Sequence, residues 1–259
     1  MKEINAIIAI AFRDVTKLLR DRTRIAANFI FPTIFIGVLG GSLQSNLSGS
    51  LPYNFLTFVF TGVLAQTLFQ STANGLISLI EDRQNDFAQE LFIAPVSRYS
   101  IIFGKIIGET LVSFFQVSAV IIFGFIIGVP ISILALIKVL PVFVMIAIFG
   151  GSFGVFVMSN LSEQRSANQI FPFLMFPQFF LAGVFNPIKI LPAPLLFASR
   201  LAPMTYAVDM VRTVYYSGTS ELSHVTLFSK IVDFGVIATL SALFIIIGTY
   251  RFVQNEKNR

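Results

Sequence analysis

Very few residues of this chain could carry out bond-making chemistry. It has no cysteine and one histidine, His224, which excludes disulfides, thiolate metal sites, cysteine nucleophiles and centres built from several histidines of this chain. The Gly-Gly-Ser sequence at 150–152 has no histidine in the same apolar stretch to act as a base. The only Gly-Lys pair, at 104–105, lacks the glycine spacing and the following hydroxyl of a phosphate-binding P-loop. We expect no catalytic residue, no metal and no cofactor bound by this chain.

The densest group of charges lies between two apolar stretches, at residues 81–98, which hold four acids and two arginines. Phe87 and Leu91 fall on one helical face, and Pro95 ends that helix because the residue before a proline avoids the α conformation. A short helix with one apolar and one acidic face suits docking to a soluble partner, and a solvated connecting loop explains the same charges equally well. The candidate docking residues are Glu81, Asp82, Arg83, Asp86, Phe87, Glu90, Leu91, Pro95 and Arg98.

A stripe of polar side chains runs along the apolar stretch 55–80. Gln66, Gln70 and Asn74 are spaced four residues apart, as on one face of a helix. Polar side chains within a membrane face the protein interior or a water-filled path, so the stripe could line a substrate route or form a polar seam between two copies. Ordinary interhelical hydrogen bonding is an equally good explanation. In the stretch 170–184, Gln178 is the matching polar candidate, next to Phe179.

Lys105 and Glu109 are spaced four residues apart near the start of the apolar stretch 102–129. An unpaired charge is costly in an apolar environment, so the spacing predicts a structural ion pair. A proton-coupling role for Glu109 is the alternative.

Close packing of helices is predicted by four pairs of glycines with the G-x-x-x-G spacing. They are Gly37/Gly41, Gly104/Gly108, Gly124/Gly128 and Gly150/Gly154.

The composition places all these residues in a membrane. The chain of 259 residues is 55% apolar and 12% charged, with a mean hydropathy of +0.82, whereas soluble domains carry about 25% charged residues. A helix of about 20 mostly apolar residues crosses a bilayer. We therefore expect an all-α membrane protein with a single domain over 1–259. Its six expected spans are 25–43, 55–80, 102–129, 133–158, 170–184 and 232–250.

The positions of lysine and arginine predict the orientation of the spans. Most of the 18 basic residues share one side of the membrane if both termini are cytoplasmic, as the preference for positive charge inside requires. The net charge of +5 follows this topology and does not indicate nucleic-acid binding. Apolar residues at helical spacing within 1–24 predict an amphipathic helix on the inner surface of the cell membrane, with a disordered basic leader as the alternative.

The segment 186–230 separates the last two spans on the outer side. Pro187, Pro192 and Pro194 interrupt its apolar part, so no run there is long enough to cross the membrane. Residues 205–216 predict a short helix in which Asp209 and Arg212 pair at a spacing of three.

Two blocks of sequence resemble the membrane subunit of ABC-2-type transporters. The first is LFIAPVSR at 91–98, followed by Gly104-Lys105 and Gln116. The second contains FP at 171–172, PQ at 177–178, LAGVFNP at 181–187, LAP at 201–203 and YAVD at 206–209. The similarity covers nearly the whole chain. It is closest to the daunorubicin-resistance-like drug exporters and the nodulation-export permeases.

The resemblance implies an arrangement that periodicity does not show. Residues 81–98 would be a coupling helix that docks in a groove of a separate ATP-binding subunit, and 1–24 would be the connecting helix. Residues 186–230 would form short re-entrant outer helices. Two copies of this chain and two ATPase chains would assemble, with ATP and magnesium bound by the partner. The resemblance also favours the substrate route for the stripe, because spans two and five line the route in such transporters.

The function expected from these observations is the permease half of an ATP-driven exporter. Its cargo would be hydrophobic or amphipathic, such as a drug, lipid or glycolipid, moved by alternating access. The alternative is a self-contained secondary transporter or channel, which the lack of charges near the centre of any expected span disfavours.

Overall fold

The computed structural model describes residues 2–21, 25–26, 30, 32–47, 51–84, 97–161 and 163–257. Over these residues the chain forms helices joined by turns and loops, with no strand, as expected. The elements are α1 (Lys2–Arg20), the π-helical η1 (Ile34–Gly40), α3 (Gly41–Leu47), α4 (Phe55–Gln84), α6 (Arg98–Ile126), α7 (Ile133–Ser159), α8 (Gln164–Leu181), the 3-10 turn η2 (Ile188–Ile190), α9 (Ala193–Leu201), α10 (Pro203–Tyr215), α11 (Leu222–Val225) and α12 (Lys230–Lys257).

Four helices of the described chain are long and apolar enough to cross a membrane: α4, α6, α7 and α12. They coincide with the predicted spans 55–80, 102–129, 133–158 and 232–250. Helix α6 ends at Ile126, earlier than expected, because the chain turns through Gly128, whose φ of 78° lies in the left-handed region that favours glycine. The six-span topology remains a prediction.

The two other predicted spans differ from these four. The span 170–184 corresponds to α8, which begins at Gln164 with a polar turn and ends at Leu181. Its apolar part from Ile170 is about 18 Å long at 1.5 Å per residue, less than the roughly 30 Å of a bilayer core. The span 25–43 lies partly outside the described residues, and its described part contains η1.

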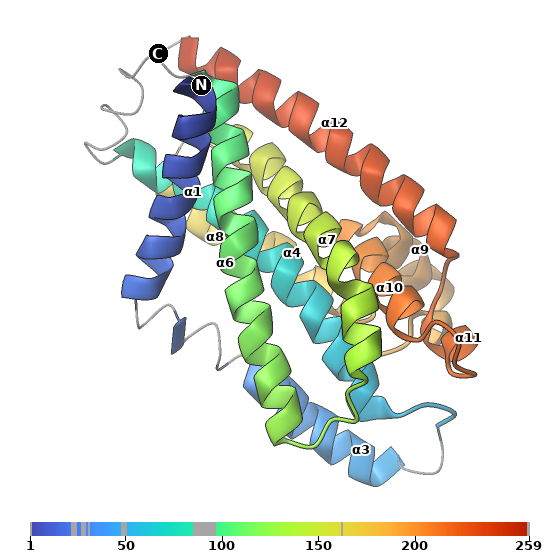
Figure 1. Ribbon diagram of the computed structural model, residues 1–259. Coiled ribbons are helices and arrows are strands. Elements are labelled where there is room, and N and C mark those ends of the chain that lie inside the picture. Colours follow the sequence, from blue (N-terminus) through green and yellow to red (C-terminus); the bar gives the residue numbers. More distant parts are fainter. Residues whose placement is uncertain are drawn as a thin grey trace.

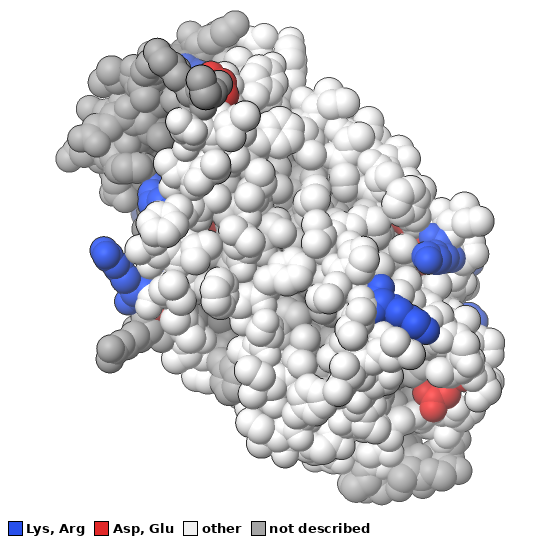
Figure 2. Space-filling model, in the orientation of Figure 1, with Lys and Arg blue, Asp and Glu red and all other residues white. Residues whose placement is uncertain are grey.

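Helix α4 is the central element of the bundle, surrounded by α6, α7 and α10 (Figure 1). Apolar side chains occur on every side of this helix, although one side also carries the polar stripe, and such a helix favours burial by its neighbours. Almost all of its side chains between Phe55 and Ile80 are buried. The surrounding helices α6, α7 and α12 expose large apolar side chains outward. In Figure 2 the middle of the visible face is free of charge, and lysines and arginines appear toward its edges. This surface suits a lipid environment.

Several short helices follow α8 and precede α12. Helix α10, predicted over 205–216, packs against α4, α7 and α12. At the opposite end of the bundle, α1 begins and α12 ends close to the start of α6 (Figure 1).

Glycines of α7 let its backbone approach α4 closely. A Cβ atom on Gly150 would lie 2.3 Å from the carbonyl oxygen of Phe69, and one on Gly154 would lie 2.5 Å from that of Ala73. The predicted packing role of this pair is therefore confirmed. In the two other predicted pairs only one glycine is closely packed. A Cβ atom on Gly124 would lie 2.6 Å from the Phe60 ring of α4 and one on Gly37 would lie 3.5 Å from the Phe123 ring, whereas one on Gly41 or Gly128 would meet no atom within 4 Å.

Adjacent glycines of α7 provide a matched test of this seam. We expect Gly150→Ala to destabilise the protein by about 1–3 kcal/mol, because the added methyl overlaps the α4 backbone. Gly151→Ala is the control, since its Cβ would lie 3.4 Å from Ile106, an ordinary contact. Thermal unfolding of the two variants in detergent measures the difference, and equal stability of both would contradict the packing argument.

Candidate functional site

The structure describes only the ends of the predicted coupling segment. Asp86, Phe87, Glu90, Leu91 and Pro95 lie outside the described residues. Glu81, Asp82 and Arg83 continue the backbone of α4 to Gln84, with side chains that are not described, and Arg98 is the half-buried first residue of α6. The segment therefore joins the central helix α4 directly to α6.

The start of α6 is held by α1. The Ser97 side chain caps α6 by accepting a hydrogen bond from the Ser100 amide at 3.1 Å, and Glu3 of α1 accepts one from the Ser97 amide at 3.2 Å. Hydrogen bonds from the Ser100 side chain and the Ser97 amide lower the pKa of Glu3. Helix α1 thus holds the chain at the exit from the coupling segment.

Two glycines bring α1 into close contact with α6. Cβ atoms on Gly104 and Gly108 would lie 3.1 Å from Ile7 Cα and 2.9 Å from Ala11 Cα. The predicted packing role of this G-x-x-x-G pair is confirmed, and its partner is α1.

A buried cluster of charges lies in the same seam. Lys105 Nζ is 3.0 Å from Asp14 Oδ1 and 3.1 Å from Glu109 Oε1, and all three side chains are 1% exposed. Arg13 Nη2 also lies 3.0 Å from Asp14 Oδ1. Lys105 and Glu109 are therefore in ion-pair contact, and Asp14 joins their helix to α1.

The cluster also reaches the central helix. A Cβ atom on Gly75 of α4 would lie 2.0 Å from the carboxyl carbon of Glu109, so the carboxylate occupies a notch that only glycine leaves open. Two acids and two bases thus meet at the junction of α1, α6 and α4. The geometry makes these helices a mechanically linked unit at the end that carries residues 81–98.

Asp14 and Arg13 are the members of this cluster that the sequence pattern did not indicate. Ile4, Ile8, Phe12 and Leu19, which follow helical spacing within 1–24, are each more than half exposed. The buried face of α1 instead contains Ile10, Ala11, Asp14 and Leu18. These four residues also follow helical spacing, and an acid in an otherwise apolar stripe is the signal in the sequence that could have identified Asp14.

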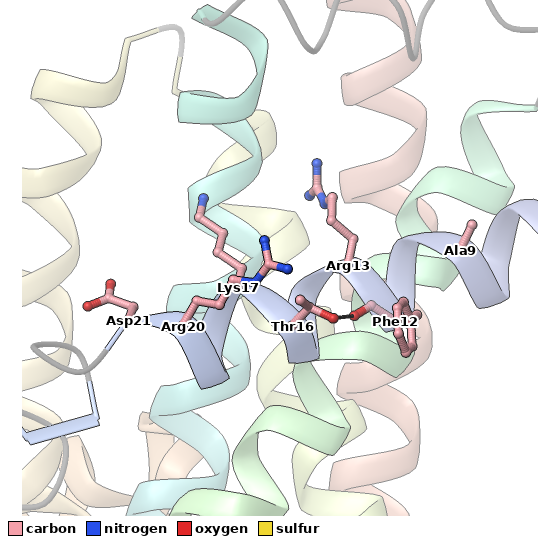
Figure 3. A pocket seen from close by; sticks show the side chains of 7 residues that line it. All are labelled: Ala9, Phe12, Arg13, Thr16, Lys17, Arg20 and Asp21. Atoms are coloured by element: carbon pink, nitrogen blue, oxygen red, sulfur yellow. Dashed lines mark hydrogen bonds between the residues drawn. The ribbon is translucent and has the colours of Figure 1, made fainter.

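Helix α1 presents its other side to the surroundings. Figure 3 shows Arg13, Lys17 and Arg20 projecting from α1 beside a shallow hollow that Phe12 also lines. Exposed apolar side chains next to basic ones are typical of a helix at a membrane interface.

The polar stripe of α4 passes from the core to an open surface. Gln66 is buried, Gln70 is half-buried and Asn74 is exposed, and Gln66 Nε2 donates to Gln70 Oε1 at 3.5 Å. Asn74 is the one exposed side chain between Phe55 and Ile80. Leu56, Gln70 and Ser78 are the other side chains between Phe55 and Ile80 that are not fully buried, and each of them is half-buried. We call the line of Gln70, Asn74 and Ser78 the open strip of α4.

The predicted residues of α8 turn toward α10. Gln178 Oε1 accepts a hydrogen bond from the Met204 amide at 3.2 Å, and its Nε2 donates to the Leu174 carbonyl at 3.1 Å. Gln178 and Phe179 are both buried, whereas Phe176 and Phe180 are more than half exposed. Gln178 thus provides a hydrogen-bond acceptor for a backbone amide in the first turn of α10. The exposed face of α8 carries aromatic side chains.

Arg212 fastens α10 to the central helix. Its fully buried guanidinium lies 3.5 Å from the centre of the Phe58 ring and donates to the carbonyls of Phe58 and Val184 at 3.1 and 3.2 Å. Burial lowers the pKa of Arg212 to about 10, so it remains charged at neutral pH. A Cβ atom on Gly62 would lie 2.8 Å from its Nη2, which makes this glycine part of the Arg212 site.

The predicted pairing of Asp209 with Arg212 is wrong. The Asp209 carboxylate instead accepts the amides of Leu227 and Phe228 at 2.7 and 2.6 Å. Burial raises the pKa of Asp209, and these two hydrogen bonds oppose that shift. Asp209 and Arg212 instead form hydrogen bonds with backbone groups outside α10, which their spacing of three residues could not predict.

The chain shows sequence similarity to known proteins. Residues 5–216 match the sequence pattern of the family described as ABC-2 type transporter. A protein named transport permease ycf38 from Cyanophora paradoxa is 24% identical over 263 residues, covering 98% of this chain and 90% of that protein. The protein of the same name from Porphyra purpurea is 24% identical over 224 residues, covering 83% of this chain and 74% of that protein.

The buried cluster predicts strong coupling between α1 and α6. We expect Lys105→Met to destabilise the protein by about 3–5 kcal/mol, because two buried acids lose their shared cation. Combining it with Asp14→Asn should recover part of this loss, with a coupling free energy of about 0.5–3 kcal/mol in a double-mutant cycle of thermal unfolding. Lys138→Met, at an exposed position of α7, is the control and should be nearly neutral. Additive effects of the first two changes would contradict the interaction.

Proposed function

Because the chain belongs to the ABC-2 type transporter family, we propose that it is the permease subunit of an ATP-driven exporter in the cell membrane. Its cargo is a hydrophobic or amphipathic molecule, such as a drug, a lipid or a glycolipid. The observation that carries this proposal is the family match over residues 5–216, which includes α1, the coupling segment and α10. Relatives named as transport permeases are consistent with it.

A separate ATPase would supply the energy. The sequence contains no P-loop, so the nucleotide and its magnesium ion bind to the partner subunit. The acidic and apolar residues of 81–98 are the docking element of this chain. Because the segment joins α4 to α6, a force applied to it acts on both helices.

The Lys105 cluster explains how such a force could be transmitted. Asp14, Lys105 and Glu109 join α1 to α6, and the Glu109 carboxylate fits against Gly75 of α4. Breaking one of these contacts would leave a buried charge without a partner, so the helices move together. Movement of α4 would then reach α10 through Arg212 and its carbonyl partner on Phe58.

The open strip of α4 is the proposed substrate route. Gln70 and Asn74 present amides on a helix that is otherwise buried, and an amide facing lipid tails would lack hydrogen-bond partners. A second copy of the chain facing this strip would enclose a path with amide groups in an apolar wall. Alternating access would then open this path first to one side of the membrane and then to the other.

Charge reversal tests the coupling segment. We expect Glu90→Lys to reduce the amount of ABC ATPase that copurifies with a tagged chain, roughly tenfold, because a basic side chain replaces an acidic one in the docking face. Glu163→Lys is the matched control, since Glu163 is exposed in the connection between α7 and α8. ATP-dependent transport by the purified chain alone would contradict the proposal. So would labelling of a single cysteine at position 90 from the outside of intact cells, an experiment that the cysteine-free chain permits.

A second change tests the route. Asn74→Leu should lower cargo transport by the assembled complex about tenfold, equivalent to about 1.4 kcal/mol, while leaving ATPase copurification unchanged. Ser118→Leu, at an exposed position on α6, serves as the control for adding an apolar side chain to the surface. If Asn74→Leu transports cargo as fast as the wild type in vesicles, the open strip does not line the route.

A further inference from the structure

Two aspartates meet where α10 packs against the start of α12. Asp233, in the first turn of α12, is 0% exposed, and neither of its carboxyl oxygens has a hydrogen-bond donor from the described residues. Asp209 lies on α10, which packs against α12, and its carboxyl group acts on Asp233 both as a like charge and as a hydrogen-bonding neighbour. Two carboxylates cannot share a hydrogen bond unless one of them carries a proton.

The two acids have unequal surroundings. Asp209 accepts the amides of Leu227 and Phe228 at 2.7 and 2.6 Å, and these donors favour its ionised form. Among the described residues no such donor reaches Asp233, which has that negative charge as a neighbour. The arrangement is that of paired carboxyl groups that share one proton because like charges in contact cannot both persist.

We propose that Asp209 and Asp233 form a proton-binding site in which the protonated Asp233 donates a hydrogen bond to the Asp209 carboxylate and joins α12 to α10. This site is distinct from the Lys105 cluster and from the proposed ATPase contact.

The charged groups around the pair are consistent with one negative charge and not two. Arg212 of α10 and Lys189 of η2 both act on Asp209. The Arg212 guanidinium, however, donates a hydrogen bond to the Phe58 carbonyl of α4, and Lys189 Nζ donates to the Ser223 carbonyl at 2.7 Å. Tyr206 of α10 stacks on Phe228, and both Asp233 and Arg200 of α9 act on its hydroxyl group.

The remaining elements that pack on α12 bring no cation to the pair. The titratable residue of α7 is Lys138, which lines a separate hollow with Tyr215 and Glu221. On α6, Lys105 and Glu109 belong to the cluster with Asp14. The exposed His224 of α11 is not among the groups that act on either acid.

A metal ion fits the pair less well than a proton. Calcium takes six to eight oxygen ligands, and magnesium requires octahedral geometry. Within the described part of the chain, no group of three or more aspartates, glutamates, cysteines or histidines lies together. Two carboxyls, one of them already accepting two amides, are a sufficient site for a proton.

The shared proton makes the contact between α10 and α12 sensitive to pH. An unfolded chain releases the protons of its aspartates near pH 4, so a proton retained by the folded pair means that the folded state binds more protons. Stability then falls as the pH rises. Loss of the proton leaves two buried negative charges in contact and weakens the attachment of α12, while α10 remains fastened to α4 through Arg212.

The test compares the purified wild-type chain in detergent with Asp233→Asn. The asparagine amide can donate to Asp209 without needing a proton. The wild type should show the infrared carbonyl band of a protonated carboxylic acid at pH 7, and Asp233→Asn should lack it. The wild-type unfolding equilibrium constant should increase about tenfold per pH unit above about pH 4, where the unfolded chain has released this proton and the folded pair still holds it, and should level off once the folded pair loses it. Asp233→Asn should not show this increase.

Glu163→Gln, at an exposed acid, is the control and should behave like the wild type in both measurements. Absence of the wild-type band, or its persistence in Asp233→Asn, would overturn the proposal. Stabilisation of the wild type by sodium or calcium at fixed pH would assign the pair to a metal cation and would also overturn it. Because the measurements need no ATPase, their outcome is independent of the proposed coupling.

Discussion

A charge buried in an apolar helical bundle must have an opposite charge or a hydrogen-bond partner, or its desolvation destabilises the fold. In this chain that constraint determines which helices are joined. Lys105 holds Asp14 and Glu109 where α1, α6 and α4 meet. Arg212 holds two carbonyls and an aromatic ring where α10 meets α4. The apolar surfaces of these helices would tolerate many relative positions, whereas each buried charge is satisfied in only one.

Helix α4 connects these two charged contacts. Most of it is buried by its neighbours. The Glu109 carboxylate fits against its Gly75, and the Arg212 guanidinium lies over the ring of its Phe58. At one end it continues into the segment 81–98, and toward the other it contacts α10. A displacement of the segment would therefore act on α10 through a rigid element held by charge at both contacts. This is the physical content of the proposed coupling between an ATPase and the transport route.

The sequence predicted the features that depend on local pattern. Long apolar runs predicted α4, α6, α7 and α12, and glycine spacing predicted the close seams at Gly104/Gly108 and Gly150/Gly154. It did not predict which helix would fill a seam, so α1 and its Asp14 were missed as the partners of α6. The spacing of Asp209 and Arg212 suggested a pair, but amides of the turn before α12 and carbonyls near α4 compete for them. These partners are 18 and 154 residues away, beyond the reach of helical periodicity. The span predicted over 170–184 extends past the end of α8 at Leu181, because the chain leaves the helix through Gly183, whose φ of 74° lies in the left-handed region.

The open strip of α4 follows from the same constraint. A helix that is buried on every other side exposes an amide at Asn74, next to the half-buried Gln70. Lipid tails offer an amide no hydrogen bond, so the strip requires water, a polar part of the cargo or another protein surface. Contact with a second copy and a water-filled route are compatible solutions, because a route enclosed between two copies would hydrate the amides while apolar side chains line the rest of the wall. The exposed aromatic face of α8, with Phe176 and Phe180, supplies apolar surface of the kind that such a wall needs. Under the proposed function, this arrangement favours a cargo with a large apolar part and a small polar one over a fully hydrated solute.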